Sequence, residues 1–299
     1  MRVFVTGASG FIGSAVIDEL HDAGHEVVGL ARSDEAAAAL TAAGVEVHRG
    51  ALDDLASLQD GAAAVDGVIH LAFDNDFTDY AGAVAADLRA VEAIGAALDG
   101  SGKPFVVTSG TLGLAFVPTP GRPGTEDDVP DRSLPRMASE HATIAFAARG
   151  VRSSVVRLAP CVHDAERAGL ASRLIGIARA HGVSAFVGDG TNRWPAIHRR
   201  DAAHLFCGAL EAAPAGTRLH ATDEEGVPLR DIADVIGRHL NVPVVSITAE
   251  EAGEHFGFLA LPMSLDNPTS SALTRQRLGW QPVHPGLIRD LDGGHHYDG

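Results

Sequence analysis

The sequence has few cysteines, few aromatic residues and a shortage of positive charge. Only Cys161 and Cys207 are present, and aromatic residues make up 5% of the 299 positions. Two cysteines are too few for a disulfide framework or a cysteine-rich zinc site, so we expect each to be a small apolar residue in a reducing compartment. Acidic residues outnumber basic ones by 39 to 23, and the net charge is −16. That balance argues against nucleic-acid partners and against anionic membrane surfaces.

Long apolar segments are also missing. The chain starts Met1-Arg2-Val3-Phe4-Val5, without the apolar stretch of a secretory signal. The longest apolar runs have the length of strands, well below the roughly 20 residues that a membrane-spanning helix needs. The sequence therefore predicts a cytoplasmic protein with no membrane partner.

The first half of the sequence alternates short β-branched runs with alanine-rich helical patterns. The expected strands are Val3–Thr6, Glu26–Leu30, Glu46–Arg49, Gly67–Ala72 and Phe105–Ser109. The expected helices are Phe11–Ala23, Asp34–Ala43, Leu55–Ala64 and Ala81–Leu98. Strand–helix–strand units with short connections predict an α/β fold of the Rossmann type, a doubly wound parallel sheet with helices on both faces.

The second half is less regular. A loop rich in proline, glycine and acidic residues, Val117–Pro135, is expected to be a mobile surface segment that could act as a lid. Further helices are expected at Arg136–Arg149, Asp201–Glu211 and Arg230–Leu240, and strands at Ser153–Leu158 and Arg218–Ala221, before an irregular tail. We expect residues 1–160 and 196–224 to form the Rossmann core, and residues 161–195 and 225–299 to form a smaller substrate-binding portion.

The strongest motif, Thr6-Gly7-Ala8-Ser9-Gly10-Phe11-Ile12-Gly13, follows the first expected strand and opens the first expected helix. Gly7 permits a tight turn, Gly10 lets backbone N–H groups approach a pyrophosphate, and Gly13 lets the helix pack on the strand. The helix N-terminus, which includes Phe11 and Ile12, adds partial positive charge toward the phosphates. The motif predicts a dinucleotide-binding loop; the alternative is a glycine-rich turn without a ligand.

The end of the second expected strand bears on the choice of coenzyme. An NAD site has a carboxylate there for the ribose 2′-hydroxyl, whereas this sequence reads Ala31-Arg32-Ser33. Arg32 and Ser33 could instead bind a 2′-phosphate. We therefore expect NADP(H) in preference to NAD(H); the alternative is that Arg32 points into solvent.

These features resemble the extended and atypical short-chain dehydrogenases/reductases of the NAD-dependent epimerase/dehydratase family. The segment Val68-Ile69-His70-Leu71-Ala72 is similar to that family's fourth strand, which implies that Leu71 and Ala72 lie beside the coenzyme. Further resemblances lie at Val106–Ser109, Val156–Pro160, Gly188–Asp201 and Leu278–Pro282. The resemblance implies a Rossmann fold, a nicotinamide coenzyme and a small-molecule substrate.

The sequence departs from that family at its active site. The family uses a tyrosine with a lysine four residues later, and Arg136 and Glu140 stand at those two places here. The only tyrosines are Tyr80 and Tyr297 and the only lysine is Lys103, so no other alignment restores the pair. The pattern resembles an atypical subgroup that keeps the glycine loop and lacks Tyr-x-x-x-Lys.

Three side chains are candidates for catalysis because they follow strands whose carboxyl ends bind ligands in such folds. Ser109 or Thr111 could hydrogen-bond a substrate oxygen, and His163 could exchange a proton near neutral pH. The alternatives are strand-end caps for the two hydroxyls and an ordinary structural role for the histidine.

The candidates for substrate contact are Asp76, Tyr80, Arg136, Trp194 and His198. Arg136 could polarise an oxyanion but cannot act as a base. Trp194 suits a ring-bearing or anionic ligand because Arg193 is its neighbour, or it could anchor a domain interface. Asp76, Tyr80 and His198 have structural alternatives as a solvated loop charge, a packed ring and a structural histidine.

No metal site is expected from the sequence. His295-His296 and the pair His21 and His25 come without carboxylates or cysteines at ligand spacing.

Two functions from different classes stay open at this point. One is an NAD(P)-dependent oxidoreductase or epimerase-like enzyme acting on a small carbonyl or hydroxyl compound, with a non-standard proton donor. The other is a catalytically inactive NADP(H)-binding regulatory or sensor protein. The alanine-rich stretches Ala81–Leu98 and Ala138–Ala148 suit a homodimer interface as well as packing within one chain.

Overall fold

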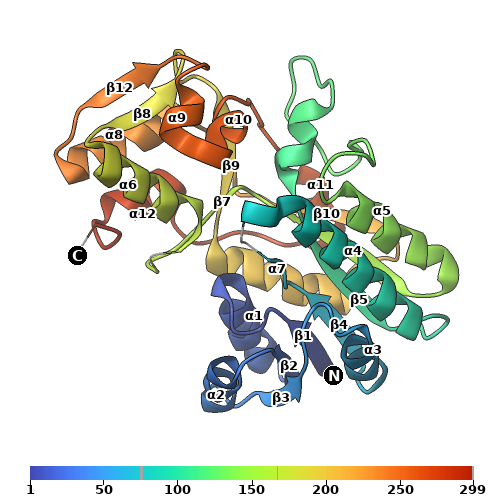
Figure 1. Ribbon diagram of the computed structural model, residues 1–299. Helices are drawn as coiled ribbons and strands as arrows, with labels where there is room; N and C mark the ends of the chain where they lie inside the picture. The colour runs from blue at the N-terminus through green and yellow to red at the C-terminus, as the bar shows by residue number, and fades with distance from the viewer. Residues whose placement is uncertain (75–76, 167, 298–299) are drawn as a thin grey trace.

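A seven-stranded parallel sheet organises the larger part of the chain in the computed structural model, which describes residues 1–74, 77–166 and 168–297 (Figure 1). The strand order is β10-β6-β5-β4-β1-β2-β3, and every neighbouring pair is parallel. The strands are β1 Arg2–Thr6, β2 Glu26–Ala31, β3 Glu46–Arg49, β4 Gly67–His70, β5 Pro104–Gly110, β6 Arg152–Leu158 and β10 Thr217–Ala221. The chain moves outward from β1 in both directions, which confirms the doubly wound Rossmann fold.

Helices cover both faces of this sheet. One face carries α1 Phe11–Asp22, α2 Asp34–Ala42 and α7 Arg199–Ala212, and the other carries α3 Leu55–Ala63, α4 Tyr80–Ala97 and α5 Met137–Ala145. In β1, Val3 and Val5 pack into the first helical layer, whereas Phe4 packs into the second. This alternation follows from the period of two residues in a strand. It explains why β1 has three successive apolar residues, Val3, Phe4 and Val5.

The remaining elements form a smaller portion with its own apolar core, at the upper left of Figure 1. It holds the sheets β11-β9-β7 and β12-β8. Its elements are β7 Cys161–His163, α6 Gly169–His181, β8 Ser184–Val187, β9 Arg193–His198, β11 Glu224–Pro228, α8 Leu229–Leu240, β12 Val244–Ile247, α9 Ala252–Phe256, α10 Ala260–Met263 and α12 Leu287–Asp292. The helix α11 Ala272–Leu278 instead packs beside β10 of the large sheet. Short 3₁₀ turns are η1 Phe77–Asp79, η2 Thr111–Phe116, η3 Phe146–Arg149 and η4 Gly257–Leu259.

The prediction of an irregular tail after α8 was wrong. The tail contains β12, α9, α10, α11 and α12, which are between 4 and 7 residues long. Elements of that length show less than two turns of helical periodicity, so their pattern is not readable in the sequence.

The loop of residues 117–135 is attached to the C-terminal part of the chain. Gly124 N–H donates to Pro268 O at 2.8 Å, and Ser270 N–H donates to Gly124 O at 2.8 Å. Glu126, only 1% exposed, accepts hydrogen bonds from the backbone and hydroxyl of Thr274 at 2.7 and 2.6 Å. The composition of this loop suggested a mobile segment, but these bonds hold its middle against residues that follow much later in the sequence.

Candidate functional site

The glycine loop between β1 and α1 is shaped by close backbone contacts. Gly7 has a φ of +69°, and a Cβ there would lie 2.7 Å from the backbone nitrogen of Ala72. A Cβ at Gly13 would lie 2.0 Å from Gly7 O. Both positions therefore require glycine, for the turn and for the approach of α1 to the loop. Leu71 and Ala72 adjoin this loop, since Leu71 N–H bonds Thr6 O and Ala72 N–H bonds the Thr6 hydroxyl, both at 3.2 Å.

The N-terminus of α1 is open to a ligand. Gly10 is the N-cap residue, it is exposed, and no side chain caps the helix. The first turn also has no acidic residue. The positive end of the helix dipole, with the N–H groups of Phe11 and Ile12, is therefore not neutralised by a carboxylate of that turn. A diphosphate fits this donor set, because it supplies the acceptors that a capping side chain would otherwise supply.

The carboxyl end of β2 carries positive charge. Arg32 is exposed and makes no hydrogen bond or ion pair with another described residue. Ser33 caps α2 by accepting the Ala36 N–H at 3.2 Å. Arg49 is opposite Ala31 in the β2–β3 register and pairs with Asp34 at 2.6 Å, a contact on the surface. Arg49 is thus a second cation at this edge of the sheet.

A buried chain of polar groups starts beneath the glycine loop. His70, at the end of β4, lies 2.8 Å from the Thr6 hydroxyl through Nδ1 and 3.4 Å from Asp87 Oδ1 through Nε2. Burial acts to raise the pKa of Asp87, but His70 and Arg136 outweigh it, so this pKa is lowered and Asp87 is a carboxylate. Because a carboxylate only accepts, we assign the His70 proton to Nε2, and Nδ1 then accepts from Thr6.

Arg136 is in a strained conformation at the start of α5. Its φ is +66°, and Asn241 is the other non-glycine residue with positive φ in the described part of the chain. Its guanidinium donates to Thr108 O at 3.1 Å, lies 4.0 Å from Asp87 Oδ1 and stacks over the Phe73 ring at 4.1 Å. A β-region backbone would avoid this strain, so the fold holds Arg136 at the carboxyl end of β5 against a local cost of roughly 1 kcal/mol.

Glu140, one turn later on α5, is directed elsewhere. It is fully buried and bonded to Arg157 at 2.5 and 3.0 Å and to Arg218 at 2.8 Å. Burial acts to raise the pKa of Glu140, but the two arginines outweigh it and lower this pKa to about 2. Glu140, which is expected from the sequence at the lysine position, therefore forms a structural ion pair between α5 and the strands β6 and β10.

Hydroxyl groups collect at the carboxyl end of β5. Ser109 is 3% exposed, and neither its Oγ nor the Oγ1 of Thr108 has a hydrogen-bond partner within the described ranges. Thr111 is fully buried and accepts a long bond of 3.4 Å from the Asn267 amide. A buried hydroxyl without a partner costs free energy, and a bound ligand oxygen would remove that cost. Of the catalytic candidates, Ser109 has the clearest unused donor.

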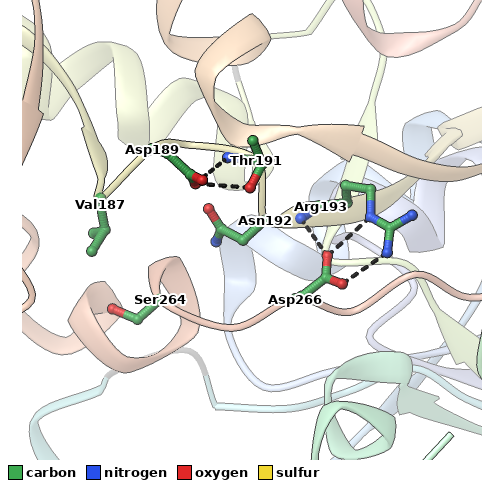
Figure 2. A pocket seen from close by; sticks show the side chains of 8 residues that line it. Val187, Asp189, Thr191, Asn192, Arg193, Ser264 and Asp266 are labelled. Atoms are coloured by element: carbon green, nitrogen blue, oxygen red, sulfur yellow. Dashed lines mark hydrogen bonds and ion pairs between the residues drawn. The ribbon is translucent and has the colours of Figure 1, made fainter. Parts of the chain in front are cut away.

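A groove runs from η2 toward β9. One section, of about 290 Å³, is lined by Leu114 and the following loop on one side and by Arg193 and Asp266 on the other. A neighbouring hollow of about 650 Å³ shares Arg193 and Asp266 with it, and Figure 2 shows Arg193 held there by Asp266 through its backbone and guanidinium. The guanidinium bonds are 2.8 and 3.1 Å long. Arg122, which lines the first section, is paired with Asp128 at 2.6 Å.

The remaining sequence candidates occupy different surroundings. Trp194 is 1% exposed in the core of the smaller portion, which favours the alternative of an anchor over direct ligand contact. His163 is buried and donates to Asp290 at 2.9 Å. His198 stacks on His284 at 4.5 Å, and burial together with the neighbouring histidines lowers the pKa of His198 to about 4.

Tyr80 begins α4, and its ring meets Phe73 edge-on at 6.1 Å. Burial raises the pKa of Tyr80, while the charge of Arg136 acts in the opposite direction. Tyr80 and Arg136, both substrate candidates, are thus brought to the same Phe73 ring. The remaining candidate, Asp76, lies outside the described residues.

None of the helices in the described part of the chain is long and apolar enough to cross a membrane.

Two residues of the site escaped sequence reasoning. Asp87 and Arg49 belong to no motif, yet one signal for Asp87 existed. It shares a helical face with Ala83, Ala90 and Val91, and a lone carboxylate on such an apolar stripe calls for a buried partner.

The sequence and fold match known proteins over nearly the whole chain. A model of the NAD dependent epimerase/dehydratase family matches residues 3–221. An uncharacterized protein of Schizosaccharomyces pombe is 51% identical over 292 residues, 97% of this chain and 98% of its own. One from Saccharomyces cerevisiae is 45% identical over 295 residues, with the same two shares. The solved structure of a dTDP-glucose 4,6-dehydratase from Streptomyces venezuelae, with NAD bound, covers 97% of this chain and 96% of its own at 18% identity, with a TM-score of 0.76.

Proposed function

Because the chain belongs to the NAD dependent epimerase/dehydratase family, we propose that it is an NADP(H)-dependent oxidoreductase acting on a small carbonyl or hydroxyl compound. Its proton donor then differs from the tyrosine that the family normally uses. The observation that carries this proposal is the unused Ser109 hydroxyl, which follows directly after the Thr108 carbonyl that holds Arg136. A hydrogen-bond donor and a cation thus meet at the carboxyl end of β5, where Rossmann folds bind their ligands.

The glycine loop and the N-terminus of α1 would hold the diphosphate, and Arg32 with Ser33 would receive a 2′-phosphate. When bound, the coenzyme supplies or accepts the hydride. Ser109 then donates a hydrogen bond to the substrate oxygen, and Arg136 stabilises negative charge that develops there. Asp87 and Phe73 keep the Arg136 guanidinium in place.

Arg136 is permanently charged and Ser109 is a weak acid, so a further group must supply the proton. We propose Tyr80 for that role. Its phenol is near enough to Arg136 for the guanidinium charge to act on the Tyr80 pKa. Tyr80 carries its proton at neutral pH. Burial raises its pKa and makes the phenol a weaker acid, whereas the charge of Arg136 acts to lower that pKa and so favours release of the proton to the substrate oxygen.

The groove favours an uncharged substrate. The arginines that line its described walls, Arg122 and Arg193, each already bond a carboxylate. A ligand with a diphosphate would have to displace Asp128 or Asp266, which costs the bonds those residues make. A small neutral carbonyl compound requires no such displacement.

The coenzyme assignment is tested by fluorescence titration with NADPH and with NADH. We expect NADPH to bind at least about tenfold more tightly, because a charge-assisted phosphate contact contributes about 1.5–3 kcal/mol. The Arg32→Ala variant should lose most of that difference while its NADH affinity stays the same. Binding of neither coenzyme would overturn the proposal, and equal losses for both in Arg32→Ala would remove Arg32 from the phosphate site.

The catalytic assignment is tested by NADPH oxidation with a panel of small aldehydes and ketones. Ser109→Ala should lower kcat by about 100-fold or more, the usual effect of removing one such donor. Ser153→Ala is a matched control, because Ser153 is also a buried β-strand hydroxyl without a described partner. It pairs with Phe105 near the amino ends of β5 and β6, whereas Ser109 lies near their carboxyl ends. Tyr80→Phe should lower kcat with little change in NADPH affinity.

The alternative is an NADP(H)-binding sensor without catalysis. The observation that favours it is the placement of Glu140, since the lysine position is fully occupied by a structural ion pair. Tight NADPH binding without turnover of any carbonyl compound in the panel would support the sensor and contradict the enzyme.

A further inference from the structure

The last described residues fold back onto the smaller portion. After α12, Gly293 and Gly294 reverse the chain, and Gly294 has a φ of +86°. Tyr297 then stacks on His239 of α8 with centroids 4.5 Å apart, and its carbonyl accepts from Arg179 of α6 at 2.6 Å. Figure 1 shows that the described part of the chain ends beside α6 and α12. The two residues between the glycines and Tyr297 are therefore held over α12.

This reversal brings His295 and His296 to Asp290. Nε2 of His295 lies 3.4 Å from Asp290 Oδ1, and Nε2 of His296 lies 3.4 Å from Oδ2. These separations are long for hydrogen bonds between an imidazole and a carboxylate. Ligand atoms about 2.1 Å from one tetrahedral ion lie roughly 3.4 Å from each other, so both separations match the edges of a metal site.

Nitrogen atoms at this cluster lack partners. His296 is 4% exposed, and its Nδ1 has no hydrogen-bond partner among the described residues. His295 Nε2 is likewise buried and makes no hydrogen bond within that set. A buried ring nitrogen without a partner is costly unless a further group binds it, and an ion at the Nε2 atoms would bind that of His295. On His296 the ion would add to a single long bond of 3.4 Å between Nε2 and Asp290 Oδ2.

The carboxylate itself is held from the other side. His163 of β7, which is 1% exposed, donates from Nδ1 to Asp290 Oδ2 at 2.9 Å. Second-shell hydrogen bonds of this kind orient the ligands of metal sites. Asp290 Oδ1 stays beside His295 Nε2, Oδ2 lies beside His296 Nε2, and one ligand atom of each of the three residues lies within 4.8 Å of the others.

We propose that Asp290, His295 and His296 bind one Zn²⁺ ion, with His163 as the positioning residue for Asp290. Two imidazoles and a carboxylate are donors that suit Zn²⁺, and a water molecule would complete a tetrahedral site. The ion would fasten the C-terminal tail to α12 and β7. The sequence conceals this site because Asp290 lies within a short helix and joins the histidines only through the glycine reversal.

Two other groups among the described residues are close enough together to hold an ion, but their donors are already used. In the group His198, Asp201 and His284, both Asp201 oxygens accept backbone N–H groups at 3.0 Å, and the two rings stack at 9° rather than converging. In the second group, His25, Cys207 and Glu211, His25 Nε2 bonds Glu211 at 3.0 Å and its Nδ1 faces the terminal amine at 3.2 Å.

Titration calorimetry of the full chain with Zn²⁺, after treatment with a chelator, tests the proposal. We expect one tight event per chain, weakened at least about tenfold in His295→Ala and in Asp290→Asn. His295 is partly exposed, so its truncation should leave the fold intact. His21→Ala is the matched control, since His21 is an exposed helical histidine far from the cluster in sequence, and it should bind as the parent does. No tight event, or unchanged binding in both cluster variants, would overturn the proposal.

Co²⁺ provides an independent readout that does not depend on affinity. A tetrahedral nitrogen and oxygen site should give visible absorption bands on adding Co²⁺, and these should be lost in His295→Ala and kept in His21→Ala. Hydrogen exchange of residues 293–297 should also slow on adding Zn²⁺. Slowed exchange in His295→Ala to the same extent would place the ion elsewhere and contradict the assignment.

Discussion

His70 Nε2 lies 3.4 Å from Asp87 Oδ1, and both side chains are 1% exposed. The pair joins the end of β4 to the middle of α4, and through Thr6 it reaches the strand that carries the glycine loop. Arg136 approaches the same carboxylate from α5. One buried charge therefore fixes the relative positions of the proposed coenzyme loop and the proposed oxyanion cation.

Asp87→Asn should destabilise the protein by about 1–3 kcal/mol at pH 7, because the amide leaves His70 and Arg136 without a charged acceptor. The pKa of Asp87 is lowered in the folded state, so its contribution is present above the ordinary value of 3.8 and is lost as the pH falls through the folded-state pKa. Urea denaturation measures both effects. Asp60→Asn, an exposed carboxylate on α3, should change neither the midpoint nor its pH dependence.

Glu140→Gln should destabilise the protein more, by about 3–5 kcal/mol at neutral pH. The neutral amide would leave the buried Arg157 guanidinium without a negatively charged partner. The folded-state pKa of Glu140 is about 2 against an ordinary 4.5, so its stabilisation is complete above the ordinary value and disappears as the pH falls toward 2. Between pH 2 and pH 4.5 the melting temperature of the variant should therefore depend less on pH than that of the parent. Glu92→Gln, at an exposed position of α4, is the control and should keep the pH dependence of the parent. If Glu140→Gln also keeps it, Glu140 does not govern the acid sensitivity of the protein.

Gly10→Asp should abolish NADPH binding while the fold persists. The φ of Gly10 is −83°, which any residue adopts, and aspartate is a good N-cap. Its Cβ would meet only Gly7 O, at 3.2 Å, but its carboxylate would occupy the N-terminus of α1 that the diphosphate requires. Gln59→Glu adds the same charge at an exposed position of α3, and this variant should bind NADPH as the parent does. Retained affinity in a Gly10→Asp protein with a parental melting profile would contradict the phosphate-loop assignment.

Two helical glycines should respond to alanine with opposite signs. At Gly95 in α4 a Cβ would lie 2.1 Å from the Phe146 ring, so Gly95→Ala should destabilise by about 1–3 kcal/mol through overpacking. At Gly208 in α7 nothing lies within 4 Å, so Gly208→Ala should stabilise by about 0.5–1 kcal/mol through helix propensity. Chemical denaturation of the two variants gives the comparison directly. If both variants changed the free energy of unfolding by the same amount and sign, α4 would be able to move away from Phe146 at little cost.

The fold and the family were predictable because they depend on local pattern. The β-branched runs and the glycine spacing of Gly7, Gly10 and Gly13 report strands, helices and a loop whose geometry only glycine permits. The contacts around Arg136 were not predictable, since Asp87 and Phe73 come to it from other elements. Trp194 shows the same limit, because the pattern around an aromatic residue does not say whether its ring faces a ligand or a core.

The hydrogen bonds between Gly124 and residues 268–270, and between Glu126 and Thr274, impose an order on the making of this protein. During synthesis the glycine loop and the first strands leave the ribosome early and can begin to assemble. The wall of the groove that follows β5 has no partner until the segment around Thr274 has been translated. A nascent chain could therefore acquire its coenzyme loop long before its substrate groove exists. In chains that stop short of Thr274, the Glu126 carboxylate would lack the two hydrogen-bond donors that it has in the full chain.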